Sequence, residues 1–137
     1  MVKKIFNGES AIFGRISSII AKELLKGNNI VLINSEKVLI SGNKEEYVKK
    51  MRAKLKMGRG SSMKGPKYIR REDLILKRMI RGMLPWDRAK GRNAFKNLRC
   101  YISLGNLPEE EIKKAIKIEF KKPIKSFTVE EFIRALK

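Results

Sequence analysis

The chain has 137 residues, the size of one domain, and its longest aliphatic run, Ile30–Ile33, is far shorter than a membrane-spanning helix. It has no histidine and one cysteine, Cys100, which leaves no partner for an intrachain disulfide and no Cys/His cluster for a metal. Its net charge of +19 predicts an anionic partner. We therefore expect a cytoplasmic protein with no metal, no cofactor and no membrane segment.

The first third of the chain predicts a strand–helix–strand unit. Lys3–Asn7 is β-prone, and Gly8 interrupts it. Ile30–Ile33 is the kind of continuous aliphatic run seen in strands whose two faces are both covered. Between them, one apolar helix face is formed by Ile16, Ile19, Ile20 and Leu24. This order predicts two parallel strands joined by a crossover helix.

After a short extended piece at Val38–Ile40, Asn43 is placed to cap an amphipathic helix. We expect this helix to have a basic outer face and to bury Tyr47, Val48, Met51 and Leu55. Residues 58–67 follow, rich in glycine, serine and basic residues and free of acids. They predict a loop that becomes ordered against a partner. Pro66 stands where a phosphate-binding loop would need its lysine, which argues against a nucleotide site.

The next two helices meet at a Pro85-Trp86 corner. The first begins at Glu72-Asp73, with its acids at the positive end of the helix dipole. It is expected to end near Gly82 and to bury Leu74, Ile75, Met79 and Met83. Asp87 is expected to cap the second helix, whose packing residues are Ala94, Phe95 and Leu98. For Trp86, packing in the corner is favoured over stacking on a base.

The last third predicts two strands and two helices. Arg99–Leu104 has a strand pattern, and Pro108 sets the first turn of a helix. Ile118–Phe120 is a candidate edge strand. Thr128 and Glu131 form a capping box for a final helix that is expected to dock through Val129, Phe132, Ile133 and Leu136.

Positive charge is concentrated in the middle of the chain. Residues 1–48 carry seven Lys/Arg against five Asp/Glu, residues 49–99 carry eighteen against three, and residues 100–137 carry eight against six. The net charges are therefore +2, +15 and +2. A merely solvated face usually mixes both signs, so this distribution favours binding to a polyanion.

Residues suited to catalysis are scarce. Histidine, the commonest general acid or base, is absent, and Cys100 lies in an apolar strand pattern typical of a small core residue. The three acids of the basic region, Glu72, Asp73 and Asp87, are all accounted for by helix starts. We therefore expect a protein that is not an enzyme and has no small-molecule substrate.

Several motifs, in this order and spacing, resemble the universal large-subunit ribosomal protein thirteen family. They span roughly residues 5–105 and are Phe13–Ser18, Ala21–Gly27, Ile33–Val38, Ile40–Lys44, Arg81–Pro85 and Gly91–Tyr101. Where the bacterial form carries a His-Thr-Gly-His loop, this chain has Lys56–Ser61, as in the archaeal and eukaryotic branch. Trp86-Asp87 also departs from the basic residue that often follows the proline in other members.

The resemblance implies an α/β fold, a three-layer α/β/α arrangement on a small, mostly parallel sheet. It also implies a structural protein of the large ribosomal subunit that binds ribosomal RNA, lies beside other ribosomal proteins and helps subunit assembly. We expect residues 1–137 to form one such domain, with the basic helical and loop region at 49–99 facing the RNA. The residues expected to contact RNA are Lys49, Arg52, Lys56, Arg59, Lys64, Lys67, Arg70, Arg71, Arg81, Arg88, Lys90, Arg92, Lys96 and Arg99.

Two alternatives come from other classes. An RNA-modifying or nucleotide-dependent enzyme would need a glycine-rich turn directly after the first strand, and Gly8 and Gly14 are too far apart to form one. A DNA-binding helix-turn-helix around Pro85 would offer mainly basic residues in its second helix, with only Asn93 and Asn97 suited to reading base edges.

Overall fold

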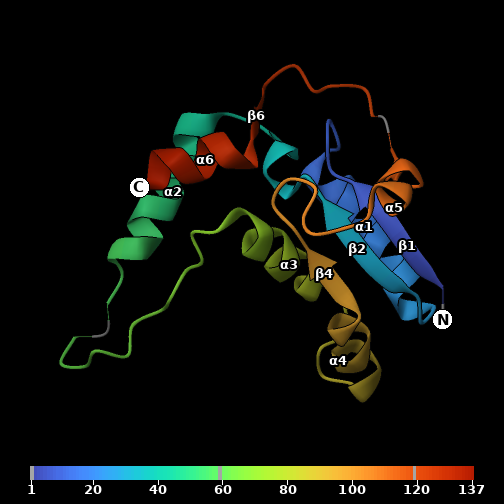
Figure 1. Ribbon diagram of the computed structural model, residues 1–137. Helices are drawn as coiled ribbons and strands as arrows, with labels where there is room; N and C mark the ends of the chain where they lie inside the picture. The colour runs from blue at the N-terminus through green and yellow to red at the C-terminus, as the bar shows by residue number, and fades with distance from the viewer. Residues whose placement is uncertain (1, 59, 119) are drawn as a thin grey trace.

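Figure 1 shows the computed structural model of the protein, which describes residues 2–58, 60–118 and 120–137. Strands and helices alternate through its first third, and helices dominate the rest. In chain order the elements are β1 (Lys3–Asn7), α1 (Phe13–Leu25), β2 (Asn29–Ile33), the short 3₁₀ helix η1 (Ser35–Lys37), β3 (Leu39–Ser41), α2 (Lys44–Lys56), α3 (Glu72–Gly82), α4 (Ala89–Lys96), β4 (Leu98–Cys100), α5 (Glu109–Lys113), β5 (Ile116–Lys117), β6 (Ser126–Thr128) and α6 (Val129–Leu136).

The predicted strand–helix–strand unit is confirmed. β1 and β2 are parallel neighbours, in register from Lys3 opposite Asn29 to Asn7 opposite Ile33. β4 and β5 add to the two sides in the order β4-β2-β1-β5, again with parallel pairing. We expected the edge strand at Ile118–Phe120, but the strand, β5, lies two residues earlier, at Ile116–Lys117. Glu119 lies outside the described residues.

β4 is shorter than the predicted strand at 99–104, because the chain turns soon after Cys100. Ser103 has a φ of 56°, in the left-handed region that no strand residue adopts. The carbonyl oxygens of Tyr101 and Ser103 accept hydrogen bonds from the backbone N–H groups of Ser35 and Asn34, at 3.2 Å and 2.8 Å. These bonds hold the turn against the end of β2.

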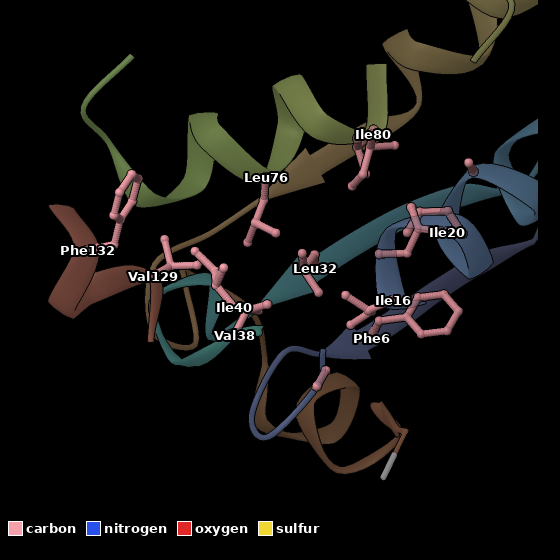
Figure 2. Close-up of a cluster of buried hydrophobic side chains, with 14 of the residues drawn as sticks. Phe6, Ile16, Ile20, Leu32, Val38, Ile40, Leu76, Ile80, Val129 and Phe132 are labelled. Carbon is pink, nitrogen blue, oxygen red and sulfur yellow. The ribbon is translucent and has the colours of Figure 1, made fainter. Parts of the chain in front are cut away.

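The main sheet is covered on one face by α1 and α3 and, over the carboxyl half of the other face, by residues around α5, which gives the predicted three layers. The larger core lies between the sheet, α1 and α3, and Figure 2 shows Leu32 of β2 between Ile16 of α1 and Leu76 of α3. On the opposite face a smaller cluster joins Ile5, Val31 and Ile33 to Tyr101, Leu107, Ile112 and Ala115. We call residues 101–115, which include α5, the α5 segment.

A second sheet, which the sequence did not predict, ties the end of the chain to the core. β3 and β6 pair antiparallel, with Ile40 opposite Phe127. The Thr128 half of the predicted capping box is confirmed, because the Thr128 hydroxyl accepts a hydrogen bond from the Glu131 backbone N–H at 3.2 Å. The Glu131 carboxylate pairs instead with Lys44, at 3.9 Å. All four predicted face residues of α6 are buried, and its Val129 and Phe132 reach the same core as Leu76 in Figure 2.

The predicted buried stripes of α2 and α3 were partly wrong. Leu76 and Ile80 are the fully buried residues of α3, whereas Met79 and Met83 are 39% and 38% exposed. The apolar stripe of α3 is wider than the face that α1 and β4 cover, so its methionines lie at the margin. In α2, Tyr47 is also exposed. Its ring packs against the ring of Phe127, with centroids 5.7 Å apart, and lies close to the backbone of Gly42.

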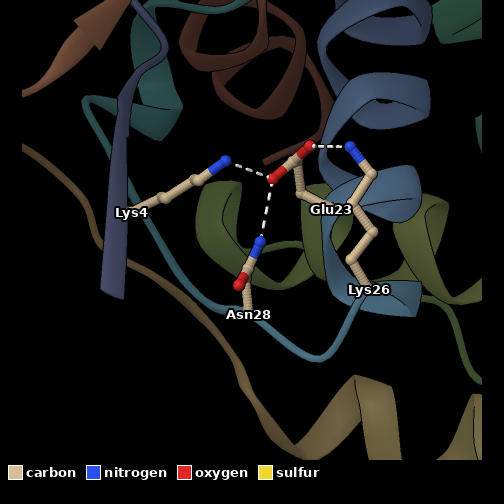
Figure 3. A network of polar contacts seen from close by, with 4 residues as sticks. All are labelled: Lys4, Glu23, Lys26 and Asn28. Atoms are coloured by element: carbon tan, nitrogen blue, oxygen red, sulfur yellow. Dashed lines mark hydrogen bonds and ion pairs between the residues drawn. The ribbon is translucent and has the colours of Figure 1, made fainter. Parts of the chain in front are cut away.

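The carboxylate of Glu23, only 13% exposed, ties the end of α1 to β1 and to the turn before β2 (Figure 3). It pairs with Lys26 at 2.7 Å and with Lys4, and it accepts a hydrogen bond from the Asn28 side-chain amide at 2.9 Å. Lys26 first, and Lys4 next, lower the pKa of Glu23 from its ordinary 4.5 to about 2. The network stabilises the fold only while this carboxylate is ionised.

Replacing this carboxylate by an amide, in Glu23→Gln, should lower the urea midpoint of unfolding at neutral pH. Because the folded-state pKa lies below the unfolded one, the contribution of Glu23 is complete above pH 4.5 and is lost as the pH falls towards about 2. Urea unfolding of both proteins across this range measures the effect. Asp87→Asn is the control, since Asp87 is exposed and its carboxylate has no partner in the described residues. A difference for Glu23→Gln that persists undiminished at the acid end would contradict this account.

Candidate nucleic-acid interface

The turn between α3 and α4 is held by a close contact between Pro85 and Gly91. Gly91 is buried on the first turns of α4, and a Cβ built there would lie 2.1 Å from the carbonyl oxygen of Pro85. The same oxygen accepts a hydrogen bond from the backbone N–H of Arg88 at 3.2 Å. The helix therefore lies directly on the turn, and only glycine at position 91 allows this. This contact fixes the direction in which α4 presents its basic residues.

Aromatic packing at the corner follows the prediction for Trp86, although this residue stays 40% exposed. The Trp86 ring meets Phe95 edge-on, with centroids 5.3 Å apart, while the Arg81 guanidinium lies 5.1 Å from the centre of the Trp86 ring. The expected Asp87 cap was wrong. α4 begins after Arg88, no side chain caps it, and the backbone oxygen of Asp87 instead accepts a hydrogen bond from the Arg92 side chain at 3.3 Å.

We use the term basic surface for the predicted RNA-contacting residues that the structure describes. Arg59 lies outside the described residues. The other thirteen are all exposed: Lys49, Arg52, Lys56, Lys64, Lys67, Arg70, Arg71, Arg81, Arg88, Lys90, Arg92, Lys96 and Arg99. They lie on α2, on the extended segment between α2 and α3, on α3, on α4 and on β4 (Figure 1).

The fold gathers some of these residues and separates others. Lys49, Arg52 and Lys56 line one hollow of about 480 Å³ along α2. Lys96 and Arg99 line another, of about 330 Å³, beside the start of the main sheet. Lys64 and Lys67 belong to the segment between α2 and α3, which extends away from the body in Figure 1. The segment has returned to α3 by Lys67, whose backbone oxygen accepts a hydrogen bond from the Arg78 side chain at 3.4 Å. The basic surface is therefore spread over several elements and contains two local concentrations of charge.

Some of the arginines also have partners within the protein. The Arg52 side chain donates a hydrogen bond to the backbone oxygen of Ala135 at 2.8 Å, which joins α2 to α6. Arg71 pairs with Asp73 at 3.0 Å. These arginines therefore support the fold as well as adding positive charge, whereas the described lysines of the surface make no ion pair with any described acid.

Two cations that were not predicted as RNA contacts lie beside the basic surface. Lys77 and Arg78 line a hollow of about 370 Å³ together with Arg81. Lys77 lies over the Phe95 ring and Arg78 over the Tyr68 ring, at 5.2 Å and 5.8 Å from the ring centres. Helical spacing could have identified Arg78, because it precedes Arg81 by three residues and shares its face.

The described residues offer little for catalysis or metal binding. Burial raises the pKa of the Cys100 thiol to about 12, so it stays protonated at neutral pH. No group of three or more acidic, cysteine or histidine side chains gathers as a metal would require in the described part. None of the helices described there has the length and apolar character needed to cross a membrane.

Comparison with known proteins places the whole basic surface within a recognised family region. The family model described as Ribosomal protein L13 matches residues 3–106. The large ribosomal subunit protein uL13 of Methanopyrus kandleri is 46% identical over 110 residues, covering 77% of this chain and 65% of that protein. The protein of the same name from Archaeoglobus fulgidus is 44% identical over 106 residues, with the same coverage of 77% and 65%. That of Methanosphaera stadtmanae is 39% identical over 121 residues, covering 87% and 84%. The chain thus spans just under two thirds of the first two relatives.

Proposed function

Because the chain belongs to the ribosomal protein L13 family, on its archaeal-like branch, we propose that it is a structural, non-enzymatic constituent of the large ribosomal subunit. In this proposal it binds large-subunit ribosomal RNA through the basic surface. It lies beside neighbouring ribosomal proteins in the cytoplasmic ribosome and helps the subunit to assemble. The names of its archaeal relatives, all large-subunit proteins, support the ribosomal role.

The observation that carries RNA binding is the exposure of the whole basic surface in a region with almost no compensating acid. Residues 49–99 hold eighteen Lys/Arg against three Asp/Glu. One of these acids, Asp73, already pairs with Arg71. A surface of this charge replaces the counterions that condense on RNA phosphates, and their release favours binding.

The fold supplies rigid support for these contacts. α2 is joined to α6 by Arg52, and α4 is seated on the Pro85 turn through Gly91. Lysine and arginine side chains on these helices contact phosphates, and polar groups beside them reach 2′-hydroxyls in the shallow groove of the RNA. Such contacts position the protein on a folded RNA without reading much of its sequence.

The salt dependence of binding tests this function. We expect the affinity of the purified protein for large-subunit ribosomal RNA to fall steeply as salt rises, because each phosphate contact releases a counterion. The triple variant Lys49→Gln, Lys56→Gln and Lys90→Gln removes three exposed charges of the basic surface. It should reduce the slope of log affinity against log salt by roughly 0.7–0.9 for each phosphate that a lysine no longer neutralises.

A second triple variant controls for total charge. Lys22→Gln, Lys37→Gln and Lys122→Gln removes three exposed lysines outside residues 49–99, and it should leave the slope unchanged. Salt-independent binding, or the same reduction of slope in both triple variants, would contradict the proposal. Equal affinity for duplex DNA would instead favour the helix-turn-helix alternative.

A further inference from the structure

The second face of the main sheet is only half covered. At its carboxyl half, Ile5, Val31 and Ile33 pack under the α5 segment. Side chains alternate between the two faces of a strand, so Lys3 and Asn29 lie on the same face as these residues, nearer the amino ends of β1 and β2. Arg99 of β4 pairs with Val31 and lies on this face as well.

The uncovered half of this face forms a pocket of about 330 Å³, at the small end of the range for ligand pockets. Three cations, two amides and one aromatic ring border it. The residues that supply these groups are Lys3, Lys96, Arg99, Asn29, Asn97 and Tyr101. Only Lys96 and Arg99 belong to the basic surface, so the pocket extends that surface onto the sheet.

Most of the polar groups of the pocket are free to bind a ligand. Lys96 and Arg99 make no ion pair with any acid the structure describes, whereas Lys3 is paired with Glu111. The side-chain amides of Asn29 and Asn97 likewise make no hydrogen bond within the described residues, although their backbones join the sheet.

The Tyr101 ring is held in place from behind. Gly105 has a φ of 62°, and a Cβ built there would lie 2.9 Å from Cγ of the Tyr101 ring, so this turn packs its backbone directly against the ring. Tyr101 also belongs to the small cluster under α5. The ring is therefore held by packing at the border of the pocket.

We propose that this pocket binds one unpaired nucleotide of the ribosomal RNA. The inference rests on the proposed function. Lys96 and Arg99 supply cations for the phosphate, Asn29 and Asn97 supply donors and acceptors for a base edge, and Tyr101 supplies a ring for stacking. A base within a helix cannot enter a hollow of this kind, whereas a base that is bulged or in a loop can be turned out into it.

Two disruptive variants, each with its own control variant, test the proposal with the full-length protein and large-subunit ribosomal RNA. Tyr101→Leu should weaken binding by roughly five- to a hundred-fold, the range for removal of one base–aromatic stack, while Tyr101→Phe should bind as the wild type does. Asn29→Asp places a negative charge in the pocket and should also weaken binding. Asn106→Asp, an exposed residue outside the pocket lining, carries the same charge change and should not. Urea unfolding of each variant confirms that it is folded.

Ultraviolet cross-linking of the complex provides an independent readout. Mass spectrometry should find a nucleotide attached to the peptide that contains Tyr101. If the RNA binds with a steep salt dependence but both pocket variants bind like the wild type and no cross-link forms there, the pocket proposal is overturned and the proposed function stands. If the wild-type protein does not bind the RNA at all, the proposed function itself fails.

Discussion

Replacing Gly91 by alanine should lower the free energy of unfolding by about 3 kcal/mol or more, the upper end of the cost of overpacking a core. The added Cβ would lie 2.1 Å from the oxygen and 2.6 Å from the carbon of the Pro85 carbonyl. These atoms belong to the backbone, so no side-chain rotation relieves the clash. α4 would have to move away from the turn, and its basic residues would move with it.

Gly82→Ala is the matched control, because it adds the same methyl group at the other end of the turn. Apart from its chain neighbours and the backbone of its own helix, no atom lies within 4 Å of a Cβ built at Gly82, the last residue of α3. Alanine is also the better helix former, by up to about 1 kcal/mol. Urea unfolding should therefore show Gly82→Ala equal to or more stable than the wild type. Equal midpoints for the two variants would show that the Pro85 contact does not constrain the fold.

This contact also gives a physical reason for two of the motifs that resemble the family. Arg81–Pro85 and Gly91–Tyr101 are two of the motifs that resemble the family, and the contact between Gly91 and Pro85 leaves no room for a side chain at position 91. Features that depend on short stretches of sequence could be predicted. The β1-α1-β2 unit and the Thr128 cap of α6 were predicted correctly, because hydrophobic period and capping chemistry act within a few residues.

Features that depend on distant segments were not readable from the sequence. The pairing of β3 with β6 joins residues nearly ninety positions apart, at Ile40 and Phe127, and no local pattern specifies it. The choice of Leu76 over Met79 as a core residue of α3 likewise depends on which neighbour covers each part of the helix. The hydrophobic period of a helix shows which residues could be buried. Which of them are buried depends on how the layers assemble.

In the candidate site, too, some features could be predicted from the sequence and others could not. The exposure of the basic residues could be predicted, because lysine and arginine are rarely buried without a partner. Their grouping could not. The pocket beside Arg99 brings together Lys3, Asn29 and Asn97 from three separate parts of the chain. Lys96 and Arg99 of this pocket were predicted to contact RNA because of their charge. Its amides and Tyr101 were not predicted to contact RNA.

The end of the chain beyond the family match should be as important for stability as the matched region. The family model ends at residue 106, yet Ile133 of α6 is fully buried in the same core cluster as Leu32 of the main sheet. Ile133→Ala removes this side chain and leaves a cavity between α6 and its neighbours. We expect it to lower the free energy of unfolding by about 3 kcal/mol, within the usual range for isoleucine in a core.

Ile124→Ala makes the same change at a fully exposed position, 104% accessible, and should leave the urea midpoint unchanged. Because both variants lack the same atoms, the difference between them isolates the effect of burial. If Ile133→Ala unfolds at the wild-type midpoint, α6 is not part of the cooperative fold. A large difference would mean that residues outside the family match help to hold the core against which α2 packs.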